Sequence, residues 1–514
     1  MKRFTFLYIL MLIASGCHID PKDPRPNIVL IMGDDIGFSD LGCYGGEIQT
    51  PNLDKLAAEG IRFSDFYNMS KCETTRSVLL TGLYQGNIKS VNIASLLGDA
   101  GYNTIQCGKE HFQKWVPEQC YAKHAFQKSL VFWTINEFFI PPDGELANPY
   151  ELNGVEISYN QLENEIDPLY KTDVLTDYAL KFLREAIGDD KPFFLYMPYN
   201  SAHYPLQARP EDIARFRGSY KAGWDKLRQE RYERMTGSGI LNPENELSPP
   251  TSNVNKFRGH PKGDDEIREK IPLYRPWESL SEEEKDELDL EMSVFAAMVY
   301  RLDLNVGRIV SFLEENHEID NTLIIYLSDN GSCPYDSNVD FDHQPGPGNS
   351  YRTLCAAWAN LGNTPFKFFK QFGHEGGAHT HLIANWPEKI LNKGSIVHTP
   401  GHVVDLYPTL LEVAGVPYPE QFNEQSTLTL HGRSLHPVFI GQEMGNPEYI
   451  VSGFGERFRM FRNGKYKIVK KNNEAWELYD LYEDRTELND LASTQPEKVK
   501  ELESAYWQWQ NELP

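Results

Sequence analysis

Four apolar segments of strand length, each followed by polar residues, dominate the hydrophobic pattern of the chain. They span residues 27–32, 103–107, 193–197 and 322–327. Near-continuous apolar strands are typical of parallel sheets that are buried on both faces. In such sheets ligands bind beyond the carboxyl ends of the strands. The pattern therefore predicts that four distant pieces of sequence deliver polar residues to one edge of a single sheet.

The polar residues that follow these strands are of the kinds used in active sites. They are Asp34 and Asp35, then Lys109 and His111, then Asn200 and His203, and finally Asp329 and Asn330. A single Asp-Asp or Asp-Asn pair is most often a loop or a helix cap. Here both pairs end apolar strands, and their oxygens are the ligands that hard divalent cations such as Ca²⁺ or Mg²⁺ prefer.

Helical patterns lie between the strands, as parallel connections require. The clearest begins at Ser281, where Glu284 completes a capping box, and its apolar positions alternate three and four residues apart up to Leu313. Two irregular stretches, 121–170 and 209–277, are rich in Pro, Asn and charge. We expect these stretches to be insertions that shape a pocket at the sheet edge.

The composition shifts after Gly415, where a smaller unit begins. Short strand candidates at 449–452, 465–469 and 476–479 precede a helical pattern at the C-terminus. We therefore predict an α/β fold with a large, mostly parallel mixed sheet sandwiched by helices over residues 25–418. A C-terminal subdomain over residues 430–514 would hold an antiparallel sheet and the terminal helix.

Residues 1–17 have the layout of a secretory signal. Basic Lys2 and Arg3 precede an apolar run that is too short to cross a bilayer comfortably. The sequence at 14–17 resembles a bacterial lipoprotein cleavage box, which would leave Cys17 as a lipidated N-terminus; an ordinary signal peptide is the alternative. We expect an exported protein, in the periplasm or attached to the outer membrane.

The charge of the chain limits its partners. A formal net charge of −24 argues against nucleic acid, which would be repelled at long range. An anionic substrate would need a local cationic pocket.

The segment SKCETTRSVLLTG at residues 70–82 raises the question of what Cys72 does. Most cysteines beside a helix start are small buried residues. Thr74 or Thr75 could cap a short helix that ends at Gly82, which places Cys72 at the helix N-terminus. Free backbone N–H groups there, together with Arg76 one turn on, favour an anion.

These residues carry a resemblance to the type I sulfatases of the alkaline phosphatase superfamily. The family signature is Cys or Ser, any residue, Pro or Ala, any residue and Arg, followed by an apolar run that closes on Thr-Gly. Cys72 to Gly82 matches it except at Thr74. Further matches occur in order along the chain at 26–35, 50–54, 108–111, 328–331, 375–377 and 476–481.

The resemblance implies a reaction and its cofactors. A separate formylglycine-generating enzyme would oxidise Cys72 to formylglycine, whose hydrate attacks sulfur and later expels sulfate, so that the thiol is a precursor. The resemblance also implies one divalent cation, with Ca²⁺ as the expected ion. Its ligands would be Asp34, Asp35, Asp329, Asn330 and the modified Cys72.

The resemblance also assigns roles to cationic and imidazole side chains. Arg76 and Lys109 would hold the formylglycine hydrate, and His111 would be the base for its second hydroxyl. His203 and Lys370 would bind the sulfate and help to protonate the leaving oxygen. Lys367 is the rival of Lys370.

The sequence thus indicates a sulfatase that hydrolyses O-sulfate esters, with a sulfated carbohydrate as the expected substrate. A small sulfated end-group is favoured over the interior of a polyanion. A phosphodiester or phosphonate ester hydrolase is one alternative. Another is an inactive glycan-binding lipoprotein in which Thr74 prevents modification of Cys72. A second metal site at His374, His379 and His381 is conceivable.

Overall fold

The computed structural model describes residues 23–133, 138–139, 149–158, 161–162, 169–251, 275–334, 343–454 and 458–513. The predicted signal segment at residues 1–17, with Cys17, lies outside this part of the chain. None of the helices described is both long and apolar enough to cross a membrane.

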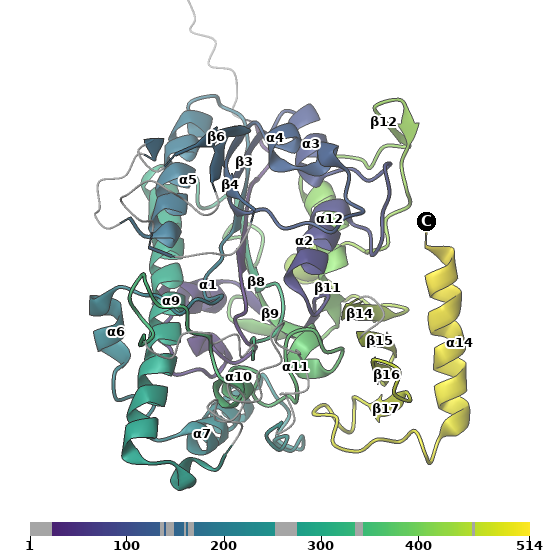
Figure 1. Cartoon of the computed structure of the whole chain (residues 1–514). Coiled ribbons are helices and arrows are strands. Elements are labelled where there is room, and N and C mark those ends of the chain that lie inside the picture. Colours follow the sequence, from purple (N-terminus) through teal and green to yellow (C-terminus); the bar gives the residue numbers. More distant parts are fainter. Residues whose placement is uncertain are drawn as a thin grey trace, which may run out of the picture.

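An 11-stranded sheet forms the centre of the molecule (Figure 1). Its strands are β1 (Asn27–Gly33), β2 (Ile61–Tyr67), β3 (Asn103–Lys109), β4 (Lys128–Phe132), β5 (Tyr150–Leu152), β6 (Val155–Ile157), β7 (Phe193–Pro198), β8 (Thr322–Ser328), β9 (His379–Asn385), β10 (Ser395–Val397) and β11 (Gly401–His402). Their order is β10-β2-β9-β8-β1-β7-β3-β4-β5-β6, and β11 also pairs with β2. The four strands predicted from apolar segments are parallel neighbours in the order β8-β1-β7-β3. Antiparallel pairs involve β9 and the β4-β5-β6 edge.

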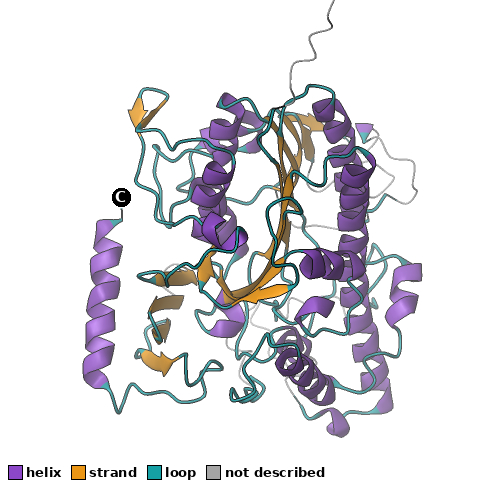
Figure 2. Ribbon diagram, turned by 180° about the vertical axis from the view of Figure 1, so that it is seen from behind, coloured by secondary structure: helices purple, strands orange, loops and turns teal. Residues whose placement is uncertain are grey.

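Helices cover both faces of this sheet, as Figure 2 shows. They are α1 (Pro51–Glu59), α2 (Cys72–Thr81), α3 (Ile93–Asp99), α4 (Ala122–Ala125), α5 (Lys171–Ile187), α6 (Pro210–Phe216), α7 (Trp224–Gly237), α9 (Glu282–Glu315), α10 (Ala356–Gly362), α11 (Glu375–Ala378), α12 (Val403–Val413) and α13 (His436–Phe439). Alternate residues of β1 enter two cores: Val29 belongs to a cluster that includes residues of α1, α5 and α9, whereas Leu30 belongs to one that includes residues of α2, α3 and α12. The predicted α/β architecture is confirmed.

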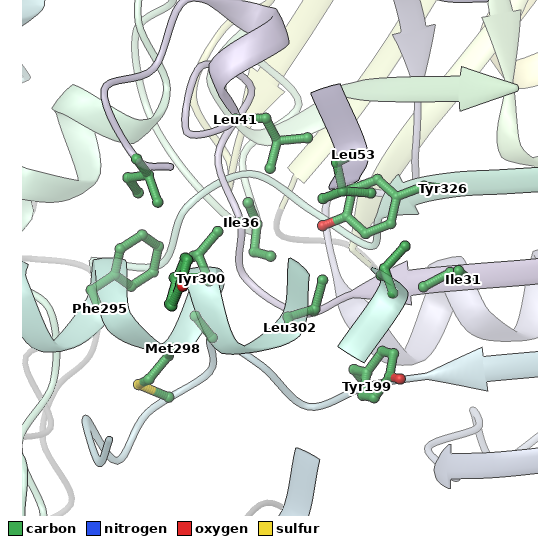
Figure 3. Close-up of a cluster of buried hydrophobic side chains, with 14 of the residues drawn as sticks. Ile31, Ile36, Leu41, Leu53, Tyr199, Phe295, Met298, Tyr300, Leu302 and Tyr326 are labelled. Carbon is green, nitrogen blue, oxygen red and sulfur yellow. The ribbon is translucent and has the colours of Figure 1, made fainter. Parts of the chain in front are cut away.

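Helix α9 begins where the sequence predicted. The Ser281 hydroxyl accepts a hydrogen bond from the Glu284 N–H at 3.2 Å, and the Glu284 carboxylate accepts one from the Ser281 N–H at 2.8 Å. Phe295 and Leu302 of this helix belong to the same buried hydrophobic cluster as Ile31 of β1, part of which Figure 3 shows. The helix therefore holds the inner face of the strand that leads to Asp34 and Asp35.

The C-terminal part has its own antiparallel sheet, in the order β14-β15-β16-β17, with a terminal helix beside it (Figure 1). The elements are β14 (Ile450–Phe454), β15 (Phe458–Asn463), β16 (Tyr466–Lys471), β17 (Glu477–Asp480) and α14 (Pro496–Glu512), and a separate hairpin joins β12 (Gln421–Phe422) to β13 (Gln425–Ser426). The predicted sheet and helix are confirmed, but sequence analysis missed β15. Two arginines interrupt its apolar pattern, and one of them, Arg462, is buried because it pairs with Asp65 at 3.0 Å.

The two stretches predicted to be irregular are more regular than expected. Stretch 121–170 supplies β4, which pairs with β3 and extends the main sheet. Stretch 209–277 contains α6 and α7. Helix α7 has little apolar periodicity because it docks through Arg231, which is buried against Asp40 at 2.7 Å and Glu47 at 2.6 Å. That these stretches border a substrate pocket stays a prediction.

Buried ion pairs join the C-terminal sheet to the main domain. Lys467 of β16 lies 2.6 Å from Glu375 at the start of α11 and 2.8 Å from Glu487, and all three side chains are fully buried. Removing one partner of a buried pair leaves uncompensated charge in a low-dielectric environment. Lys467 therefore holds two acidic side chains that would otherwise repel each other.

We expect Lys467→Met to lower the free energy of unfolding by about 3–5 kcal/mol, because it removes the buried cation that Glu375 and Glu487 share and leaves Glu375 with Arg485, 3.4 Å away, as its remaining cation. Urea denaturation measures the change. Lys465→Met is the matched control, because Lys465 is exposed and pairs with Asp480 at the surface. A Lys467→Met protein as stable as the wild type would contradict this account of the interface.

Candidate active site

The carboxyl ends of β8, β1, β7 and β3 bring the predicted polar residues together. Lys109, the last residue of β3, places its Nζ 2.6 Å from Oδ2 of Asp34, which follows β1. His203 Nε2 after β7 lies 3.4 Å from Asp35 Oδ2. The Asp35 backbone N–H donates to Asp329 Oδ1 at 3.4 Å. The predicted meeting of four sheet-edge segments is thus observed.

Cys72 is the first residue of α2, and the N-cap is Lys71. The expectation that Thr74 or Thr75 caps this helix is wrong, since both lie inside its first turn. The Thr74 hydroxyl donates to the Lys71 carbonyl at 2.9 Å, and the Thr75 hydroxyl donates to the Asp329 carbonyl at 2.7 Å. The hydroxyl of Thr75 thereby fastens the start of α2 to the end of β8.

The helix end and the position of the thiol agree with the prediction. Helix α2 ends at Gly82, whose φ of 68° is the left-handed conformation that glycine adopts readily. Cys72 is only 2% exposed, and its Sγ lies 3.5 Å from His111 Nδ1. N–H groups in a first helical turn have no intrahelical acceptor, so this end of α2 favours an anion beside Cys72.

The acidic residues form a cluster that can hold a cation. Asp34, Cys72 and Asp329 offer ligand atoms that all lie within 4.8 Å of one another. Among the described residues, three buried oxygens here accept no hydrogen bond: Asp34 Oδ1, Asp35 Oδ2 and Asn330 Oδ1. Buried polar atoms are almost always paired. A converging set of such oxygens therefore fits a hard divalent cation.

Three buried cationic side chains surround the acidic cluster. Arg76 lies 2.7 Å from Asp329 and 3.4 Å from Asp34. Lys109 pairs with Asp34, and Lys370 Nζ lies 2.5 Å from Asp35 Oδ1. The predicted local cationic pocket is present inside a strongly acidic chain.

The pKa values of two carboxyl groups diverge in this cluster. Burial raises the pKa of Asp34, but the charges of Lys109, His203 and Arg76 outweigh burial and hold it well below its usual range. Burial and then the Asp34 carboxylate raise the pKa of Asp329 to about 7. A divalent cation between the two would offset this repulsion.

Both imidazoles of the site are neutral at neutral pH. Burial, followed by the charge of Lys109, lowers the pKa of His111 to about 2. Burial also lowers the pKa of His203 to about 4, although Asp35 opposes the shift. The neutral His111 ring places its Nδ1 3.5 Å from Cys72 Sγ, where an unprotonated Nδ1 can accept a hydrogen bond.

The tautomer of His203 follows from its partner. Its Nδ1 lies 2.8 Å from the Tyr204 carbonyl oxygen, which can only accept, so Nδ1 carries the proton. Nε2 is then the ring atom that faces Asp35 and the cluster.

Two family-model matches cover almost the whole described chain. The model described as Sulfatase matches residues 26–416, and the model described as N-sulphoglucosamine sulphohydrolase, C-terminal, matches residues 365–512. The chain belongs to the sulfatase family. It is a sulfuric ester hydrolase, as the resemblance implied, and the suspected family is confirmed.

Individual relatives align over most of this sulfatase. It is 31% identical to an uncharacterised sulfatase of Schizosaccharomyces pombe, over 95% of this chain and 93% of the relative. It is 27% identical to an arylsulfatase of Klebsiella aerogenes, over 85% of this chain and 97% of the relative. It is 26% identical to an N-acetylglucosamine-6-O-sulfatase of Bacteroides thetaiotaomicron, over 99% and 91% respectively.

Solved structures share the fold of this sulfatase. The crystal structure of Ps i-CgsB matches with a TM-score of 0.65 and 26% identity, over 95% of this chain and 94% of that one. A phosphonate monoester hydrolase of Agrobacterium radiobacter matches with a TM-score of 0.56 and 19% identity, over 95% of each chain. The second match concerns the fold alone.

Sequence analysis assigned no role to Glu73 of this sulfatase. Its Oε2 lies 3.5 Å from His111 Nε2, on the opposite side of the ring from Cys72. Glu73 can therefore orient the imidazole. Its place directly after Cys72 in the motif was the available signal.

The histidine patch near Glu375 does not form a metal site in the structure. His374 pairs with Glu477, His379 lies near Asp65 and Arg485, and the His381 ring stacks on Tyr326. These three histidines point to different partners, and neither of the described groups of candidate metal ligands includes them. The conceivable second metal site at these histidines is therefore not supported.

The structure distinguishes Lys370 from Lys367 as the candidate sulfate-binding lysine. Lys370 Nζ pairs with Asp35 Oδ1 at 2.5 Å. Lys367 Nζ instead donates to the Tyr479 hydroxyl at 2.9 Å and lies over the Tyr479 ring. We expect Lys370→Ala to lower kcat/KM for a sulfate ester by about 10²–10³-fold, because it removes a buried positive charge from the anion pocket.

The matched control, Lys367→Ala, should keep kcat/KM within about threefold of the wild type, because it removes a cation that contacts Tyr479 and the Phe368 ring and not the acidic cluster. Steady-state sulfate release measures both variants. A larger loss for Lys367→Ala than for Lys370→Ala would reverse the assignment.

Proposed function

We propose that this sulfatase hydrolyses O-sulfate esters of carbohydrates by means of a formylglycine formed from Cys72 and one divalent cation, Ca²⁺ being the expected ion. The observation that carries the proposal is the position of Cys72. It lies at the N-terminus of α2, within 4.8 Å of carboxylate oxygens of Asp34 and Asp329 and beside neutral His111.

The carbohydrate substrate is supported by what the relatives act on or bind. One is an N-acetylglucosamine-6-O-sulfatase, and others are N-acetylgalactosamine-6-sulfatases at 26% identity. Ps i-CgsB, also at 26% identity, has been crystallised with k-i-k-neocarrahexaose. These names differ in the sugar, so the proposal stops at sulfated carbohydrate.

The cation would be held by the three oxygens of Asp34, Asp35 and Asn330 that accept no hydrogen bond. Asp329 and residue 72 would complete the set. When bound, such a cation supplies Lewis-acid polarisation of the sulfate and activates the nucleophile.

The remaining residues bind the anion and move protons. Arg76 and Lys109 would fix the group at residue 72, and His111, oriented by Glu73, would accept a proton from it. Lys370 would hold the sulfate from the Asp35 side and help to protonate the leaving oxygen. His203 would share this role when a proton is on Nε2, because its Nδ1 proton is engaged by the Tyr204 carbonyl.

Thr74 affects the maturation step, in which Cys72 would be oxidised to formylglycine. The Thr74 hydroxyl donates to the Lys71 carbonyl in the first turn of α2, so threonine at this position is compatible with the folded helix. A formylglycine-generating enzyme must then accept threonine where the signature has Pro or Ala. We include that enzyme as a partner in the proposal, together with export and a lipid anchor at Cys17.

Turnover of paired substrates tests the function. Wild-type protein from its native host is given N-acetylglucosamine 6-sulfate, an aryl sulfate and an aryl phosphodiester. Release of sulfate at a rate well above phosphodiester cleavage is expected. Preference for the phosphodiester would favour the phosphonate-type alternative, and turnover of none of them would favour a glycan-binding protein.

A further inference from the structure

The chain enters the main sheet at the end opposite the proposed reaction centre. Residues 23–26 lead directly into β1, and Asp34 and Asp35 follow the other end of this strand. The seven residues of β1 span about 23 Å at the usual rise of a strand. Figure 1 shows α3 and α4 at one end of the sheet and α10 and α11 at the other. The length of β1 therefore separates the entry point of the chain from the reaction centre.

Contacts with the amino ends of neighbouring strands fix this entry point. The Arg25 guanidinium donates to the Ala100 carbonyl at 2.7 Å, in the turn before β3, and lies 5.0 Å from the centroid of the Tyr102 ring. The side-chain amide of Asn321, just before β8, donates to the Pro24 carbonyl at 3.2 Å. The segment before β1 is thus held at the amino end of the sheet.

The lipid anchor proposed at Cys17 is close to this point along the chain. Asp23 follows Cys17 by six residues, which reach at most about 22 Å in any conformation. A lipidated N-terminal cysteine holds its chain at the bilayer surface. Asp23 therefore lies within that distance of the lipid headgroups, whereas Asp34 lies a further strand length along β1.

Two exposed aliphatic side chains lie at the same end of the sheet. Leu391, in the loop after β9, is 80% exposed, and the Glu388 N–H of that loop donates to the Asp320 carbonyl just before β8 at 3.1 Å. Val155, which begins β6, is 66% exposed and follows a turn in which the Asn153 N–H donates to the second residue of β4 at 2.8 Å. Single exposed apolar side chains are common. These two, however, lie on opposite sides of β1 in the strand order, so they flank the entry point.

We propose that the amino end of the main sheet faces the lipid bilayer in which Cys17 is anchored, and that the reaction centre lies on the far side of the protein. Leu391 and Val155 then meet the headgroup layer. The inference rests on the lipid anchor included in the proposed function and adds an orientation to it. The sulfated substrate reaches the centre from the aqueous side, so that the bilayer does not hinder even a very large substrate.

Energy transfer to the bilayer tests the orientation. Lipid-anchored protein with Leu391→Cys or Tyr351→Cys is labelled with a fluorescent donor and bound to phosphatidylethanolamine–phosphatidylglycerol vesicles that carry an acceptor on their headgroups. Tyr351 marks the end with the reaction centre, because its ring lies 6.0 Å from that of Tyr204, the neighbour of His203. Wild-type protein taken through the same labelling gives the background from native thiols.

We expect transfer from position 391 to exceed transfer from position 351 by at least about threefold, since the strand between the two ends alone spans about 23 Å. Equal transfer from the two positions, or stronger transfer from position 351, would overturn the proposal.

Turnover of a bulky substrate tests the consequence of this orientation. N-acetylglucosamine 6-sulfate linked to beads is given to wild-type protein on vesicles and to the same protein dispersed in detergent, with the free sugar sulfate as the matched control. The ratio of bead-linked to free turnover should agree within about threefold between vesicles and detergent. A fall of that ratio by about tenfold or more on vesicles would place the reaction centre against the bilayer and contradict the proposal.

Mass spectrometry of the N-terminal peptide separates this inference from the proposals on which it rests. Protein that releases sulfate without lipid on Cys17 would refute the anchor and the orientation together and leave the reaction intact. Lipidated protein that fails the energy-transfer test would refute the orientation alone. Lipidated protein that passes this test and releases no sulfate would confirm the orientation and contradict the proposed reaction.

Discussion

Replacing Cys72 with alanine is expected to lower sulfate release by at least about 10³-fold, because the variant has no group that could become the nucleophile. The fold should survive, since Cys72 is one small side chain at a helix start. Initial rates of sulfate release, measured together with the thermal midpoint, separate loss of chemistry from loss of structure.

Cys43→Ala is the matched control for this prediction. Cys43 is a partly buried thiol outside the site, and its backbone N–H donates to Asp54 Oδ1 at 2.7 Å. Activity of this control should stay within about twofold of the wild type, as expected for a substitution away from the reacting groups. If Cys72→Ala retained wild-type sulfate release, residue 72 could not be the source of the nucleophile.

Asp329→Asn is expected to release the bound cation and to lower turnover by about 10²–10³-fold. The substitution removes one carboxylate charge from the ligand set and breaks the pair with Arg76 at 2.7 Å. Metal content per chain, measured by mass spectrometry of the purified protein, should fall in parallel with activity.

Asp303→Asn controls for the loss of a buried carboxylate as such. Asp303 is fully buried, and it accepts hydrogen bonds from Asn52 and Leu53 at the start of α1, away from the sheet edge. Burial raises its pKa to about 6. This variant should lose stability and keep its metal. Full metal occupancy and full activity in Asp329→Asn would refute the cation site.

The fold was predictable where local pattern and tertiary environment agree. Apolar runs identified β1, β3, β7 and β8, and the capping box identified the start of α9. Strand β15 and helix α7 were missed because each buries an arginine, Arg462 or Arg231, whose partners lie far away in sequence. A distant partner leaves no mark on the local hydrophobic pattern.

The site was predictable to the level of residue type and position. Asp34, Asp35, Asp329 and Asn330 could be grouped because strand ends share an edge. The N-cap of α2 could not be identified from the sequence. The Thr75 hydroxyl donates to the Asp329 carbonyl, in a distant segment, and does not cap the start of α2. The choice between Lys370 and Lys367 needed the three-dimensional path of their loop, which only the structure supplies.

Mass spectrometry of the peptide that contains residue 72, taken from protein purified from its native host, tests the central claim most directly. The account predicts the mass of formylglycine at that position, despite Thr74 in the motif, in protein that also releases sulfate from a sulfated sugar. Only unmodified cysteine at residue 72 in protein that releases sulfate would contradict it.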